Sequence, residues 1–209
     1  MDLYGHPWSA PTREVRIVCA ELGIDCKLVE VGRAQGDDYL PEALNPACRI
    51  PMLDDDGVVV GEAHAIVRYL VGRYAPGSTW YPADVTARAH TDQWLDWQAL
   101  RLAPLAATLA RARAFSPQTT DPAEVSRAQE FLGRILPELD RLLREQPFVG
   151  GPQPTLADIA IFTSLEYLQL AQYELGTFHA MFRWHQSFFT RESCSATALA
   201  QVGGRFAGR

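Results

Sequence analysis

The segment Leu3-Tyr4-Gly5-His6-Pro7-Trp8-Ser9-Ala10-Pro11-Thr12-Arg13 places the start of an apolar strand before a turn and a helix start. Proline is favoured at the first helical position, because its missing N–H would have no intrahelical partner there. Ser9 therefore lies just before a helix N-terminus, where backbone N–H groups and the helix dipole favour negative charge. On this local evidence Ser9 fits an ordinary helix cap better than a residue that stabilises a bound anion.

The neighbouring sequence predicts one α/β domain. Residues 2–5 form a short apolar strand, residues 11–22 a helix that ends at Gly23, and residues 27–31 an alternating strand. The crossover rule makes these two strands parallel. Ile50-Pro51 then begins a β-hairpin with an Asp-Gly turn, and a helix over 62–74 follows. A weak helical turn is expected near 39–44. The order β-α-β-β-β-α is that of a thioredoxin-like domain with a mixed four-stranded sheet.

The second half of the chain contains helical patterns only. We expect one long helix from Asp84 to about Ala114, kinked at Pro104. Asp121-Pro122-Ala123-Glu124 and Thr155-Leu156-Ala157-Asp158 both have the form of a helix start. The residues expected on the inner face of the first of these two helices are Val125, Ala128, Phe131, Leu132, Ile135, Leu136, Leu139 and Leu142. A last aromatic-rich helix is expected over 178–189.

The fold class is therefore α/β plus all-α, with an N-terminal thioredoxin-like domain followed by a C-terminal helical bundle domain. The expected limits are 1–76 for the first domain, 77–84 for a linker and 85–209 for the helical domain. Composition agrees with a globular protein: 47% of the residues are hydrophobic and 21% charged.

Charge and cysteine usage exclude several classes. The net charge of -6 gives no basic face for a nucleic-acid partner and no attraction to an anionic membrane. No transmembrane run or signal peptide is visible. The four cysteines have no CxxC spacing and the five histidines no ligand-like pattern, so neither a disulfide framework nor a metal site is expected. These features indicate the cytoplasm.

Separated motifs make the sequence similar to the cytosolic glutathione S-transferases of the theta, delta and phi classes. Ser9-Ala10-Pro11-Thr12-Arg13 resembles their serine-type active-site motif. Asn45-Pro46…Arg49-Ile50-Pro51-Met52-Leu53 resembles N-P-x-x-x-[VI]-P-x-L, and Glu62-Ala63-His64-Ala65-Ile66 resembles E-S-x-A-I. The segment 151–158 resembles the capped helix of the family's helical domain. The likeness extends over essentially the whole chain.

The resemblance implies a glutathione co-substrate and no metal. Ser9 would donate a hydrogen bond to the glutathione sulfur and so favour the reactive thiolate. The backbone of Ile50, before a cis Pro51, would pair with the cysteinyl moiety. Arg49 would suit the glycyl carboxylate, although a solvated surface role is equally compatible with it. Glu62 would lie near the γ-glutamyl ammonium. Its negative charge is also favourable at a helix N-terminus without any ligand.

The chain departs from the family at Ala63. The family's serine there gives both its N–H and its hydroxyl to the γ-glutamyl carboxylate, and here only the N–H remains. The departure favours a weaker glutathione site. It also leaves open an altered thiol ligand or a non-catalytic binding or regulatory protein with this fold. Independently of Ala63, a dehalogenase, isomerase or peroxide-reducing reaction on the same scaffold is an alternative. Disulfide exchange is disfavoured, because Ser9 stands where a nucleophilic cysteine would be. Cys48, beside the predicted site, is more simply an incidental thiol.

The expected function is conjugation of glutathione to a small apolar electrophile by a homodimer. The residues expected to line the electrophile pocket are Trp8, Trp97, Phe115 and Tyr167. Core packing is an equally good account of Trp8, and helical spacing makes core positions the simplest account of Trp94, Trp97 and Trp184.

Overall fold

The computed structural model describes residues 1–31 and 50–198. The predicted turn near 39–44, Cys48 and Arg49 lie outside these ranges. The described residues form two compact units, one built from residues 1–78 and 193–198 and the other from residues 79–192.

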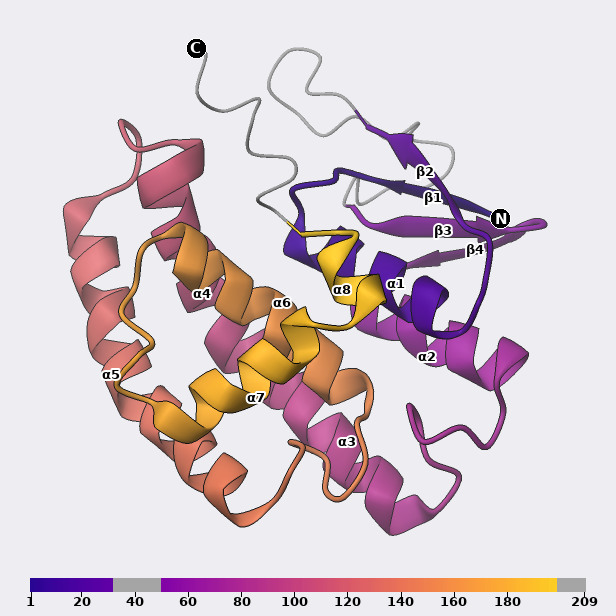
Figure 1. Cartoon of the computed structure of the whole chain (residues 1–209). Coiled ribbons are helices and arrows are strands. Elements are labelled where there is room, and N and C mark those ends of the chain that lie inside the picture. Colours follow the sequence, from indigo (N-terminus) through magenta and orange to yellow (C-terminus); the bar gives the residue numbers. More distant parts are fainter. Residues whose placement is uncertain (32–49, 199–209) are drawn as a thin grey trace. The chain divides into compact units, whose positions relative to one another are not determined.

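The first unit contains a four-stranded sheet in the order β2-β1-β3-β4 (Figure 1). The strands are β1 (Asp2–Gly5), β2 (Lys27–Glu30), β3 (Met52–Asp55) and β4 (Val58–Gly61). β1 pairs with β2 in parallel, and β3 pairs antiparallel with both β1 and β4. The predicted mixed sheet is confirmed, although its third strand begins at Met52 and not at Ile50. Asp56 and Gly57 have φ values of 51° and 91°, as the two central residues of a type I′ hairpin turn require.

Two helices, α1 (Ala10–Glu21) and α2 (Ala63–Tyr74), lie on the same side of this sheet (Figure 1). α2 buries Ile66, Val67 and Leu70 completely. The C-terminal half of α2 is bound to β3, because the Tyr69 and Tyr74 hydroxyls donate to Asp55 Oδ2 at 2.7 and 2.6 Å. These bonds fix α2 along the sheet and so set the position of its N-terminus.

Arg13 joins α1 to a C-terminal segment that the sequence patterns did not reveal. Arg13, which is 1% exposed, contacts α8 (Glu192–Ser195) and the residues that follow it. Its Nε donates to Thr197 Oγ1 at 3.2 Å and its Nη2 to the Cys194 carbonyl at 3.0 Å. Residues 193–198 are therefore part of the N-terminal unit.

Replacing Arg13 by methionine should lower the free energy of unfolding by about 2–4 kcal/mol, because two charge-assisted bonds are lost and their acceptors stay buried. Urea unfolding followed by circular dichroism measures the change. Arg127→Met, at an exposed position of the second unit, is the control and should change stability by less than about 0.5 kcal/mol. Equal stabilities for the two variants would contradict the anchoring role of Arg13.

The second unit is helical and begins differently from the prediction. The expected single helix over 84–114 consists of α3 (Val85–Trp97), the π-helical turn η1 (Gln98–Leu102), α4 (Ala103–Ala110) and the π-helical turn η2 (Arg111–Phe115). Pro104 is the second residue of α4. A proline ring clashes with the carbonyl four residues earlier, and the wider turn η1 accommodates it there. The chain adapts by a π-turn before Pro104.

The remaining helices are α5 (Pro122–Glu145), α6 (Leu156–Leu170) and α7 (His179–Phe189). α6 is buried on nearly all sides, with Phe162, Leu165 and Leu168 at 0% exposure. Both predicted helix starts are confirmed: Asp121 accepts from Ala123 N, and Thr155 and Asp158 form a capping box.

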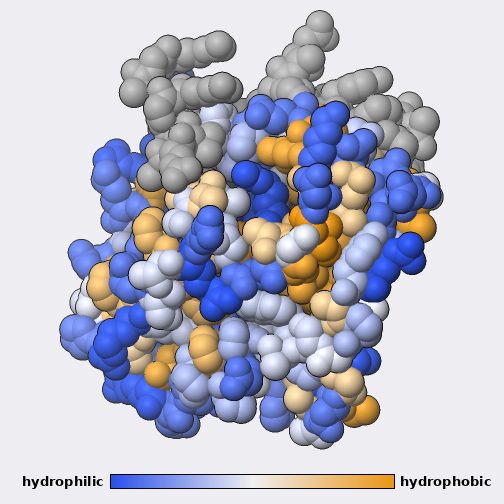
Figure 2. All heavy atoms as spheres, turned by 45° about the vertical axis from the view of Figure 1, so that its right-hand side comes forward, coloured by the Kyte–Doolittle hydropathy of each residue, from blue (hydrophilic) through white to orange (hydrophobic). Residues whose placement is uncertain are grey.

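Phe131 of α5 is an error of the sequence analysis. Its side chain is 49% exposed under the Arg134 guanidinium, because the buried stripe of α5 is narrower than the apolar pattern. Trp184 is buried as expected, whereas Trp94 and Trp97 are only half-buried. Figure 2 shows hydrophilic and hydrophobic residues intermixed on one face of the molecule.

Candidate functional site

Strand register brings three segments that are distant in the sequence to one end of the sheet. Tyr4 of β1 is paired with Met52 of β3, and Met52 is paired with Gly61 of β4. The loop that follows β1, the residues that precede β3 and the residues that follow β4 therefore meet at this end. Ser9, Ile50-Pro51 and Glu62-Ala63 lie in these three segments.

Ser9 caps α1 in the loop after β1. Its backbone is extended (φ −74°, ψ 119°), and its Oγ accepts a long 3.3 Å bond from Thr12 N. A hydroxyl carries one donor and two acceptor positions, so this bond leaves the O–H hydrogen available for a ligand atom. Ser9 therefore presents a donor at a helix N-terminus.

The strand before Ser9 is packed closely against α1. A Cβ atom at Gly5 would lie 2.5 Å from Thr12 Cγ2, so only glycine fits at the end of β1. The His6 N–H donates to Thr12 Oγ1 at 3.4 Å, and the Trp8 N–H donates to His6 Nδ1 at 3.4 Å. These contacts define the path of the loop that carries Ser9.

The Ile50–Pro51 peptide bond is cis. Pro51 is buried, and Ile50 packs partly buried against the small cluster formed by Val31, Met52 and Tyr4. The backbone of Ile50 lies directly before β3, at the end of the sheet where Ser9 lies.

Glu62 and Ala63 form the start of α2. Glu62 is the N-cap and has φ 65°, a conformation that costs a residue with a Cβ on the order of 1–3 kcal/mol. Its side chain is exposed and makes no capping bond, whereas Ala63 is buried. Strained non-glycine residues are concentrated at ligand-binding sites. The strain at Glu62 is thus an observation that favours a site here.

A buried acid beside this helix start was missed by the sequence analysis. Glu14 of α1 is 2% exposed, and its Oε1 lies 3.6 Å from Nε2 of His64, the second residue of α2. Burial raises the pKa of Glu14 to about 8, while the positive charge of Arg68 on α2 acts in the opposite direction. The signal was present: Glu14 stands three and four residues before the buried Ile17 and Val18, on the inner face of α1.

The four residues predicted for the electrophile pocket lie in both units. Trp8 is half-buried in the first unit, with its ring 4.5 Å from that of His6. In the second unit the rings of Phe115 and Tyr167 meet edge to face at 5.8 Å, and Trp97 has the same contact with Trp94 at 5.1 Å. Phe115 and Tyr167 are thus brought together, and the assignment of all four residues stays a prediction.

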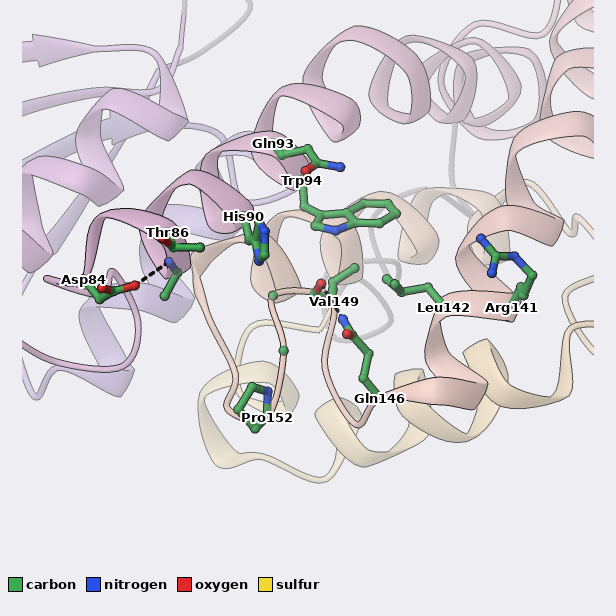
Figure 3. A pocket seen from close by; sticks show the side chains of 13 residues that line it. Asp84, Thr86, His90, Gln93, Trp94, Arg141, Leu142, Gln146, Val149 and Pro152 are labelled. Carbon is green, nitrogen blue, oxygen red and sulfur yellow. Dashed lines mark hydrogen bonds between the residues drawn. The ribbon is translucent and has the colours of Figure 1, made fainter.

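A cavity of about 570 Å³ lies within the helical unit (Figure 3). It lies between α3, the end of α5 and the turn at 149–152. Trp94, Leu142 and Val149 lie along its middle, with Asp84 and Arg141 toward opposite ends (Figure 3). None of the four predicted pocket residues lines this cavity.

The two units also correspond to two known family models. Residues 3–78 match the family model for the glutathione S-transferase N-terminal domain, and residues 122–188 match the model for its C-terminal domain. Glutathione S-transferase D7 of Drosophila melanogaster is 30% identical over 191 residues, which are 88% of this chain and 82% of that relative. The chain belongs to the glutathione S-transferase family.

Solved structures of the glutathione S-transferase family superpose on most of the chain. A delta-class glutathione transferase of Nilaparvata lugens is 29% identical, covers 94% of each chain and has a TM-score of 0.84. A theta-class glutathione S-transferase of Xanthomonas axonopodis pv. citri, solved with glutathione bound, is 28% identical, covers 94% of this chain and 96% of its own, and has a TM-score of 0.86. The predicted fold, a thioredoxin-like domain followed by a helical domain, is confirmed.

Within residues 1–31 and 50–198, no group of three or more His, Cys, Asp or Glu side chains could hold a metal ion. In the same part of this glutathione S-transferase, no helix combines the length and the apolar character needed to cross a membrane.

Proposed function

We propose that this glutathione S-transferase binds glutathione at the N-terminal end of α1 and α2 and transfers it, as the thiolate, to a small apolar electrophile. The observation that carries the proposal is the position of Ser9, whose O–H is available at a helix N-terminus. Such a donor, together with the helix dipole, stabilises a thiolate more than a thiol. Family membership favours conjugation over the other glutathione-dependent reactions and over a non-catalytic role.

The remaining parts of glutathione would use the neighbouring segments. The Ile50 backbone, before Pro51, would pair with the cysteinyl moiety in the manner of an added strand. The exposed Glu62 carboxylate would face the γ-glutamyl ammonium, and the Ala63 N–H would face the γ-glutamyl carboxylate. We assign the glycyl carboxylate to Arg49, which lies outside the described residues, because guanidinium matches planar carboxylates.

We further propose the domain limits 1–76 and 85–209 with a linker over 77–84, where residues 193–198 of the second domain pack with the N-terminal unit. We also propose a homodimer and a cytoplasmic location. The electrophile would meet Trp8, Trp97, Phe115 and Tyr167. The homodimer is supported by family membership and the location by the charge and cysteine usage of the sequence.

Replacing Ser9 by alanine tests the proposal. The lost bond to the thiolate is worth about 1.5–3 kcal/mol, so kcat/KM with a generic aryl halide should fall by about one to two orders of magnitude. The pKa of bound glutathione, read from thiolate absorbance, should rise by about one to two units. Ser9→Thr keeps a hydroxyl and should recover part of the activity.

The effect of Ser9→Ala on the thiol has to be separated from its effect on folding. Ser9→Ala also removes a helix cap, which lowers the free energy of unfolding by about 1 kcal/mol without affecting the thiol. Ser126→Ala removes an exposed helix hydroxyl and should leave both readouts unchanged. A wild-type protein that does not bind glutathione at millimolar concentration, or an unchanged thiol pKa in Ser9→Ala, would overturn the proposal.

A further inference from the structure

The pair formed by Glu14 and His64 lies next to the proposed binding site for the γ-glutamyl carboxylate. His64 directly follows Ala63, and its side chain is 16% exposed while that of Glu14 is 2% exposed. Side chains of helical residues tilt toward the N-terminus, so His64 is inclined toward the start of α2, where a carboxylate would bind. His64 is therefore both within 3.6 Å of the buried acid and on the first turn of α2, where the proposed anion site lies.

Glu14 is poorly compensated for an acid in the interior of a protein. Its Oε1 accepts no hydrogen bond among the described residues, and the distance of 3.6 Å to His64 Nε2 is too long for one. A buried carboxyl in this condition holds its proton more tightly than an exposed one. The Ser9 mechanism does not use this group.

In the described part of the chain, the other charged groups of α1, β3 and α2 are engaged elsewhere, exposed or, for Arg68, close enough to act on Glu14. Arg16 of α1 interacts with Glu30 of β2. Arg13 and Glu21 of α1 bind Thr197 and Ser193 of the C-terminal segment. Asp55 of β3 is bound by Tyr69, Tyr74 and Arg73 of α2. Glu62 at the start of α2 is exposed. Arg68, one turn after His64, is the charged group that acts on Glu14.

A carboxylate at the start of α2 would change the proton affinity of this pair. A negative charge placed beside an imidazole favours its protonated form. Ala63 provides no hydroxyl for that carboxylate. A protonated His64, the next residue, would provide a charged donor in place of the missing neutral hydroxyl. His64 Nε2 lies 3.6 Å from Glu14 Oε1, so a positive charge on His64 would act on both the bound carboxylate and Glu14.

We propose that Glu14 and His64 are a proton-linked part of the glutathione site. When the γ-glutamyl carboxylate binds at the start of α2, the pair takes up a proton from solvent, and the positive charge on His64 faces the bound carboxylate. No bond is made or broken apart from the transfer of this proton. The inference rests on the proposed function, since it presupposes glutathione at the start of α2. Glu14 acts through His64 and is a positioning residue.

S-methylglutathione is the appropriate probe. It has the γ-glutamyl carboxylate, but its sulfur is methylated and cannot release the thiol proton that Ser9 promotes in glutathione. Titration calorimetry in two buffers with different ionisation enthalpies gives the number of protons taken up per site. We expect the wild type to take up on the order of half a proton at pH 7.5 through the pair, and its Kd to rise about threefold per pH unit between pH 6.5 and 8.

The ammonium of the ligand can also change its protonation on binding, and this contribution is the same for the wild type and every variant. Comparing variants therefore isolates the proton uptake of the Glu14–His64 pair. His64→Asn should abolish the excess uptake and flatten the pH dependence of Kd. Glu14→Gln keeps His64 and should reduce the uptake without abolishing it, whereas His90→Asn in the helical unit should behave as wild type. If Glu14→Gln does not fold, His64→Asn carries the comparison. Equal proton uptake in wild type and His64→Asn would overturn the inference and leave the proposed function standing. A wild type that binds neither glutathione nor S-methylglutathione would overturn the proposed function itself.

Discussion

Replacing Asp158 by alanine should lower the free energy of unfolding by about 3–5 kcal/mol, because it removes the shared acceptor of four buried hydrogen bonds. Asp158 Oδ1 accepts from Val149 N at 2.8 Å and from Trp184 Nε1 at 3.2 Å. Its Oδ2 accepts from Thr155 N at 2.9 Å and from Thr155 Oγ1 at 3.1 Å. One carboxylate thus joins the start of α6, the turn after α5 and the side of α7.

The matched control is Asp121→Ala at the exposed start of α5. Asp121 is also a helix N-cap, and it accepts from Ala123 N at 2.8 Å, but water can replace it there. We expect a loss of about 1 kcal/mol. Urea unfolding followed by tryptophan fluorescence and by circular dichroism measures both variants. Losses of similar size at the two positions would show that Asp158 is only a helix cap and not a junction of three elements.

The comparison of these two caps shows what the sequence can predict. Asp121-Pro122 and Thr155…Asp158 are local signals, because the capping bonds join residues two or three positions apart. The strand–helix–strand order and the hairpin turn at Asp56-Gly57 are likewise encoded within short segments. That Asp158 also binds Val149 and Trp184 depends on contacts nine and 26 residues away, for which the sequence has no local sign.

The candidate site was predictable as motifs but not as an arrangement. Ser9, Ile50-Pro51 and Glu62-Ala63 were singled out by resemblance, and only the register of β1, β3 and β4 brings their segments together. The unusual backbone of Glu62 follows from the path between β4 and α2 and has no sequence signal. The π-turn η1 is also set by the wider context, since Pro104 predicts a disturbance without saying which form it takes.

Burial of Glu14 predicts an unusual dependence of stability on pH. The pKa of Glu14 is raised from 4.5 to about 8, chiefly by burial. Below pH 4.5 the carboxyl is protonated in both the folded and the unfolded chain, and its favourable contribution is fully present. Between pH 4.5 and 8 the unfolded chain releases the proton and the folded chain keeps it. Stability should therefore fall by up to about 1.4 kcal/mol per pH unit through this group, on the order of 5 kcal/mol in all.

Replacing Glu14 by glutamine should remove this slope, because an amide does not titrate. The difference in unfolding free energy between the variant and the wild type should move in favour of the variant by several kcal/mol as the pH is raised from 5 to 8. Urea unfolding at four pH values in this range measures it, and Glu145→Gln, which removes an exposed acid paired with Arg141, should give a nearly constant difference. Parallel stability curves for wild type and Glu14→Gln would mean that Glu14 ionises in the folded protein as it does in the unfolded chain. A buried carboxyl that lowers stability at neutral pH is not explained by a structural role. Its position beside His64 at the start of α2 instead fits the proposed proton-linked part of the glutathione site.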